Sequence, residues 1–124
     1  MQDKLTLSTL PHTWILDADG TICVHNGHKH GGDRILPGVK EFFAKIPAGD
    51  MIVIITSRKE SEKAALEAFL KKNGLRYDHI ICDAPMGERI LINDKKPSGL
   101  ITAYSINLNR NEGIKTDIAI DKAM

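Results

Sequence analysis

The stretch Trp14-Ile15-Leu16-Asp17-Ala18-Asp19-Gly20-Thr21 decides the fold expected for this chain. Its three bulky apolar residues predict a buried strand, and the two carboxylates stand where that strand ends. Open α/β sheets bind ligands at the carboxyl ends of their strands, where such an acidic pair could bind a divalent metal and a phosphate. Gly20 lets the chain turn sharply away from the site. The alternative is a strand that ends in a solvated Asp-Gly turn.

Two further apolar runs also end in polar residues. Residues 51–55, MIVII, predict a parallel strand covered on both faces that ends at Thr56. Residues 90–92 predict a third strand, which ends in Asn93 and Asp94. Because all three predicted strands end in polar side chains, we expect their ends to form a common site rather than three solvated turns.

The order of these motifs resembles the haloacid dehalogenase (HAD) superfamily of phosphohydrolases, over residues of about 13–108. The D-x-D-G-T motif matches at every position and is specific, whereas the strand ending at Thr56 is a weak signal alone. The motif ILIND matches the last acidic strand, with Asn93 in place of one acid. The resemblance implies an α/β fold with one Rossmann-like, HAD-type domain over residues 1–124. That domain would have three layers, a mostly parallel central sheet and no cap domain.

The resemblance implies catalysis through an aspartyl phosphate. Asp17 would be the nucleophile, and Asp19 would protonate the leaving oxygen and later take a proton from water. Thr56 would donate a hydrogen bond to a phosphoryl oxygen. Mg²⁺ would be bound by the Asp17 carboxylate, the Asp19 main-chain carbonyl and Asp94. The residues expected to line the substrate site are Gly20, Thr21, Ser57 and Arg58.

The chain departs from the family at its third motif, a Lys or Arg that precedes the last acidic strand. Only residues 83–88 separate the predicted strands 79–82 and 89–92. Parallel neighbours need a crossover of a dozen or more residues, so this connection is too short for one. We therefore expect residues 79–82 to run antiparallel, as a ribbon or an edge strand.

The missing cation must then come from another part of the chain. Lys95 and Lys96 directly follow Asp94 and are the first candidates for this cation. Arg58 and Arg89 are the next candidates. The alternative for the lysine pair is a solvated turn before Pro97.

Helical periodicity and capping residues predict the covering elements. Apolar residues spaced for one helix face follow Pro37 and predict a helix up to residue 46, and a second helix is expected over residues 59–73, capped by Gly74. Ser57 and Glu60 also have the spacing of a capping box, which makes Ser57 a candidate helix cap. Residues 101–108 predict a last strand, followed by a polar and partly extended tail.

The family's cap domain has no counterpart in the expected fold. Residues 22–36 hold a short loop rich in glycine and histidine, and the later interval is shorter still. Capless members take a macromolecular substrate or let a neighbouring subunit cover the site. By that analogy we expect a homo-oligomer, specifically a tetramer.

The loop of residues 22–33 has three possible roles. It contains Cys23, His25, His28 and His30, but their spacing matches no strong zinc motif. The loop is alternatively a flap whose histidines, Lys29 and Arg34 contact an anionic substrate. A mobile, solvated loop is the third reading.

Composition supports a small cytoplasmic enzyme. The 124 residues carry a net charge of +1, which gives no sign of a nucleic-acid or membrane-surface partner. We see no secretory signal and no membrane span in the sequence. The two cysteines form no metal-binding spacing, and a reduced compartment is the simpler expectation.

The sequence therefore predicts a magnesium-dependent phosphomonoesterase that acts on a phosphorylated sugar or related small metabolite, with surface-carbohydrate synthesis as its setting. A phosphatase for a phosphoprotein or a nucleic-acid end, or a phosphotransferase, would use the same residues. A non-catalytic subunit that binds metal or phosphate is the remaining alternative. Asp19 argues against that alternative, because a binding module needs no acid/base residue there.

Overall fold

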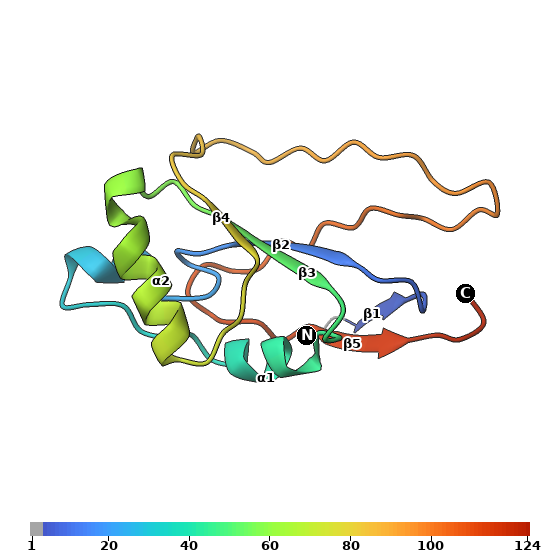
Figure 1. Ribbon diagram of the computed structural model, residues 1–124, viewed down its shortest axis with the longest axis horizontal. Helices are drawn as coiled ribbons and strands as arrows, with labels where there is room; N and C mark the ends of the chain where they lie inside the picture. Colours follow the sequence, from blue (N-terminus) through green and yellow to red (C-terminus); the bar gives the residue numbers. More distant parts are fainter. Residues whose placement is uncertain (1–3) are drawn as a thin grey trace.

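The computed structural model describes residues 4–124, and its strands form two open parallel sheets (Figure 1). One sheet has the order β2 (Thr13–Asp17), β3 (Met51–Ile55) and β4 (His79–Ile81). The other pairs β1 (Lys4–Leu7) with β5 (Asp117–Ile120). The α/β class and the parallel pairing of the first two predicted strands are confirmed, and the arrangement is compatible with a Rossmann-like fold.

The two predicted helices are present. α1 spans Val39–Lys45, and the second helical segment consists of a 3₁₀ turn, η2 (Glu60–Glu62), followed by α2 (Lys63–Lys72). Gly74 has a φ of +70°, the left-handed geometry that ends a helix, as predicted. The proposed Ser57 cap is wrong, because the segment starts at Lys59, whose backbone N–H donates to the Glu62 carboxylate at 3.1 Å.

No helix in residues 4–124 is both long and apolar enough to cross a membrane.

The helices cover one face of the β2-β3-β4 sheet. In the register, Trp14 lies beside Ile52, Leu16 lies beside Ile54, and Ile54 lies beside Ile80, and all five are buried. The buried residues of α1 and α2 belong to the same core cluster, and the Phe42 ring meets the Trp14 ring edge to face at 5.6 Å. On this side the sheet has a continuous core.

The other face of this sheet is not covered to the same degree. Ile15 and Met51 are exposed, Val53 and Ile55 are only partly buried, and Ile81 is exposed. The expectation that strand 51–55 is covered on both faces is therefore wrong. Within residues 4–124 the expected third layer of helices is also missing, since both helices of the sheet pack into the one core.

β4 pairs with β3 in parallel, so the predicted antiparallel run of residues 79–82 is wrong. α2 supplies the crossover that a parallel neighbour needs, between the end of β3 and the start of β4. The short connection of residues 83–88 lies after β4 and therefore places no constraint on the direction of β4 itself.

Two predicted strands do not form, and two unpredicted ones do. Residues 90–92 and 101–108 lie outside every strand, and Ile90 and Ile92 are exposed. Residues 89–108, which we call the arm, run out from the body and back, on the side away from α1 and α2 (Figure 1). A turn closes its tip, where the Lys96 N–H donates to the Leu100 carbonyl at 2.9 Å. The strands β1 and β5, from the two ends of the described chain, were not predicted.

A buried carboxylate fastens the start of β2 to the start of β3. Asp50 precedes β3 and accepts hydrogen bonds from Trp14 Nε1 at 2.9 Å and from the His12 backbone N–H at 3.0 Å. His12 Nδ1 lies 2.7 Å from the same carboxylate. Burial opposes ionisation, but these hydrogen bonds outweigh it and hold the pKa of Asp50 below its ordinary value.

Asp50→Ala is expected to lower the free energy of unfolding by about 3 kcal/mol, because three donors lose a charged acceptor. Urea denaturation at pH 7 measures this change. Because the folded-state pKa of Asp50 is depressed, its contribution is complete above the unfolded value near 3.8 and is lost as the pH falls through the folded value. Asp121→Ala at an exposed position is the control, with an expected change within about 0.5 kcal/mol. Equal effects of the two substitutions would contradict the fastening role of Asp50.

Candidate active site

The carboxyl ends of β2 and β3 bring Asp17 and Thr56 to the same edge of the sheet. Asp17 pairs with Ile55 in the register, and Thr56 directly follows Ile55. Thr56 is fully buried, and its hydroxyl accepts a hydrogen bond from the Arg58 backbone N–H at 3.1 Å. The hydroxyl proton is therefore free to be donated to a group at the strand ends.

Asp17 is accessible and faces a cation. Its side chain is 36% exposed, and its Oδ1 lies 3.1 Å from Arg89 Nη1, at the start of the arm. The Thr21 hydroxyl approaches its Oδ2 at 3.5 Å. Among the four cations considered for the missing third motif, Arg89 is therefore the one that contacts the expected nucleophile.

Asp19 is held by a buried arginine. Arg58 Nε and Nη2 donate to the two Asp19 carboxylate oxygens at 3.0 and 2.8 Å. The same guanidinium donates to both oxygens of Asp33, at 3.1 and 2.7 Å. The Arg58 side chain is 3% exposed, so this two-carboxylate ion pair belongs to the interior of the site. Arg58 was expected to bind substrate, but in this conformation its donors are engaged by protein carboxylates.

This ion pair fixes the charge state of its members. Burial raises the pKa of Asp19, but the hydrogen bond and the charge of Arg58 outweigh it, and the net pKa is below 3.8. Burial lowers the pKa of Arg58, and the two carboxylates more than reverse that and raise it. Asp19 is therefore a carboxylate in this conformation.

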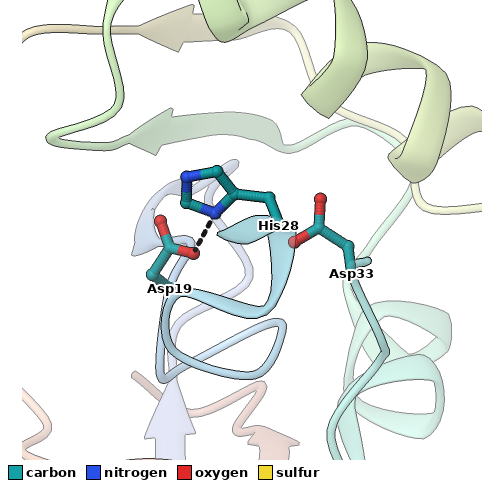
Figure 2. A group of neighbouring side chains, drawn as sticks. All are labelled: Asp19, His28 and Asp33. Atoms are coloured by element: carbon teal, nitrogen blue, oxygen red, sulfur yellow. Dashed lines mark ion pairs between the residues drawn. The ribbon is translucent and has the colours of Figure 1, made fainter. Parts of the chain in front are cut away.

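His28 extends the cluster toward α2. Its Nδ1 lies 3.8 Å from Asp19, and its Nε2 lies 3.0 Å from the Glu62 carboxylate. Figure 2 shows the imidazole beside Asp19, with Asp33 on a neighbouring segment. Asp19, His28 and Asp33 offer ligand atoms within 4.8 Å of one another, but the Arg58 guanidinium already supplies the positive charge that both carboxylates require. We assign this cluster as an ion pair and not as a metal centre.

The zinc alternative for the histidine-containing loop finds little support. Burial, together with the nearby Asp19 charge, raises the pKa of Cys23 to about 12, so this thiol is not a ready thiolate ligand. Cys23 Sγ instead lies 3.5 Å from the Arg58 guanidinium. His25 and His30 are not in the cluster of possible ligands found among the described residues.

The turn after Asp19 has the geometry that its glycine suggested. Gly20 has a φ of +87°, and a Cβ there would lie 3.1 Å from the Arg110 side chain. The Gly20 carbonyl accepts from the Asn111 N–H at 2.9 Å, and the Asn111 side chain accepts from the His25 N–H at 2.7 Å. The segment that follows the arm is therefore tied to the same turn that carries the acidic pair.

The remaining predicted site residues lie on the arm or on the surface. Asp94, Lys95 and Lys96 are exposed near the arm's tip, and the Asp94 carbonyl accepts a hydrogen bond from the Thr102 hydroxyl. The strand that was expected to carry Asp94 to Asp17 does not form. Ser57 is exposed between Thr56 and the 3₁₀ turn.

Sequence reasoning missed Asp33, His28 as a partner of Asp19, and Glu62. Asp33 follows two glycines in a loop with no periodic pattern, so no local signal marks it. The signal that could have found it is Arg58 itself, because a guanidinium directly after a buried strand end requires carboxylates nearby.

This chain matches no protein-family model, no curated protein and no solved structure.

Proposed function

We propose that this protein is a phosphomonoester hydrolase that uses Asp17 as its nucleophile. The observation that carries the proposal is the placement of Asp17, partly exposed, and Thr56, buried with a free hydroxyl proton, on neighbouring parallel strand ends. Arg89 beside Asp17 supplies a cation that can face phosphoryl oxygens. A phosphorylated sugar or similar small metabolite remains the proposed substrate class.

The proposed chemistry has two displacements. An Asp17 carboxylate oxygen attacks phosphorus, and the ester oxygen leaves and receives a proton from Asp19, which for this step must be released from Arg58 and carry a proton. Water then attacks the phosphorus of the acyl phosphate, its proton passes to the Asp19 carboxylate, and Asp17 is released as inorganic phosphate leaves. Thr56 and Arg89 stabilise the phosphoryl oxygens in both steps.

Mg²⁺ is the cofactor proposed from the resemblance. Oxygen donors with few carboxylates suit this ion, and the accessible Asp17 carboxylate and the Asp19 main-chain carbonyl belong to the same strand end. Bound there, the ion would neutralise the charge between the anionic nucleophile and the phosphate. Asp94, the third donor expected, is on the arm.

Phosphate release from phosphorylated sugars, nucleotides and phosphopeptides tests the proposal. The assay is run with Mg²⁺ and with chelator. We expect magnesium-dependent release, strongest with small sugar phosphates. Preferred release from phosphopeptides or nucleic-acid ends would move the substrate to a macromolecule. Absence of release from the whole panel, with Mg²⁺ still bound, would support a non-catalytic binding subunit instead.

The Arg58 contact gives the Asp19 role a sharper test. Asp19 must carry a proton to assist an alkoxide leaving group, whereas p-nitrophenolate leaves without one. Asp19→Asn is therefore expected to lower kcat by roughly 10²-fold to 10³-fold with a sugar phosphate and by about tenfold with p-nitrophenyl phosphate. Equal losses with the two substrates, measured by phosphate release at pH 7, would contradict proton donation by Asp19.

A further inference from the structure

The arm exposes apolar side chains that an isolated chain leaves in water. Ile92 is 90% exposed and Ile90 is 83% exposed, and Ile101 and Tyr104 on the returning limb are also exposed. Several exposed large apolar side chains on one segment are characteristic of an interaction site. The same residues have the β-branched, apolar character that predicts a strand, and what they lack here is a neighbouring strand.

The strand β2 has a free edge with which another strand can pair. It is at the end of the strand order, so one of its edges has no strand beside it among the described residues. A groove of about 1130 Å³ lies along this edge, between residues 10–17 on one side and residues 88–108 on the other. An open edge next to exposed apolar surface is a template for strand addition.

The chain's own arm does not place Asp94 beside Asp17 in this structure. The arm starts at Arg89, which already contacts Asp17 at the carboxyl end of β2. From there it runs back along β2 toward residues 10–13, as the groove lining and Figure 1 show. In its own chain the outgoing limb is therefore antiparallel to β2, and Asp94 lies away from Asp17.

A second copy related by a two-fold axis across the arm reverses that direction. Its outgoing limb would run parallel to β2 of the first copy and carry its tip toward Asp17. With Asp94 placed beside Asp17, the alternation of a strand puts Ile92 beside Ile15, which is 52% exposed on the face without helices. The same placement brings Lys95 and Lys96 to an acidic end of the groove that contains Asp17 and Glu88.

We propose that two copies of this chain exchange arms, so that residues 90–94 of each copy add a strand to the free edge of the other copy's β2. Each active site would then be completed by Asp94 and the lysine pair of the second copy. This role in the site rests on the proposed function, whereas the strand exchange does not. The tetramer expected from the sequence would contain two such pairs.

The oligomeric state tests the exchange without any assay of activity. Light scattering coupled to size-exclusion chromatography is expected to give a dimer or a multiple of it. Ile92→Asp should shift the protein to monomer while the helical signal in its far-ultraviolet circular dichroism is unchanged. Met86→Asp is the matched control, because Met86 is equally exposed, at 90%, but precedes the arm. A monomeric wild type, a dimer that survives Ile92→Asp, or equal dissociation by Met86→Asp would overturn the exchange.

Mixed assemblies test whether the partner completes the site. Asp17→Asn and Asp94→Asn are each expected to be inactive alone. Unfolded together and refolded at equal amounts, they should recover about one quarter of wild-type activity, because half of the pairs are mixed and each mixed pair has one intact site. Absence of recovery, with an active wild type and confirmed mixed pairs, would overturn the shared site. An inactive wild type that still forms arm-dependent dimers would refute the proposed function and leave the exchange standing.

Discussion

Asp17→Asn is expected to lower kcat for phosphate release by a factor on the order of 10⁴ or more, because the amide cannot attack phosphorus. The substitution preserves shape, and the lost charge lies at a side chain that is 36% exposed. The fold should therefore be retained. Phosphate release is measured at saturating substrate with Mg²⁺, and thermal unfolding is recorded in parallel.

Asp121→Asn is the control for this loss, since Asp121 is exposed and its carboxylate contacts the backbone N–H of Ala123. Its activity should equal that of the wild type. Full activity in Asp17→Asn would remove Asp17 from the nucleophile role. A loss of activity that accompanies unfolding would show a structural role instead, which the exposure of Asp17 argues against.

Arg58→Met is expected to reduce the free energy of unfolding by about 3–5 kcal/mol, because it leaves the carboxylates of Asp19 and Asp33 inside the protein without their cation. Four donor contacts from the one guanidinium are lost together. Urea denaturation at pH 7 measures the effect. The penalty should shrink as the pH falls, because without Arg58 the burial of Asp19 raises its pKa and the variant takes up a proton there.

Arg89→Met provides the matched control for Arg58→Met. Arg89 also forms an ion pair, with Asp17, but its side chain is 37% exposed, so the expected loss is below about 1 kcal/mol. Adding Asp33→Asn to Arg58→Met should recover part of the stability by removing one unpaired charge. Similar losses in the two arginine variants would contradict the distinction between the buried and the exposed pair.

The elements predicted correctly are those specified by local pattern. β2 and β3 have continuous apolar residues, and α1 and α2 have helical spacing with a glycine after α2, so each is identifiable without knowledge of any long-range contact. The direction of β4 was predicted wrongly because the short connection after it was given more weight than α2 before it.

The errors involve strands whose formation depends on parts of the chain that are distant in sequence. Residues 90–92 satisfy the local pattern of a strand, but a strand also needs a hydrogen-bonded neighbour, and none pairs with them within residues 4–124. β1 and β5 have weak patterns and exist because they pair with each other. Local pattern cannot reveal such pairing.

The part of the site that lies at the strand ends could be predicted from the sequence. Asp17 and Thr56 lie where the sequence placed them, because parallel strands in register bring their carboxyl ends together. The partners of Arg58 depend on how the loop around Asp33 folds over the strand ends, which no spacing rule specifies. Nor could the sequence show that Arg89, rather than a lysine after Asp94, contacts Asp17.

The pairing of β1 with β5 has a consequence for how the chain folds. The two strands come from opposite ends of the described sequence, so forming this sheet closes a loop of nearly its full length. Contacts of such long range form late and slow folding. On the ribosome, β1 emerges before β5 and stays unpaired until β5 is synthesised. Amide protection in β1 should therefore appear after that in β3 during refolding.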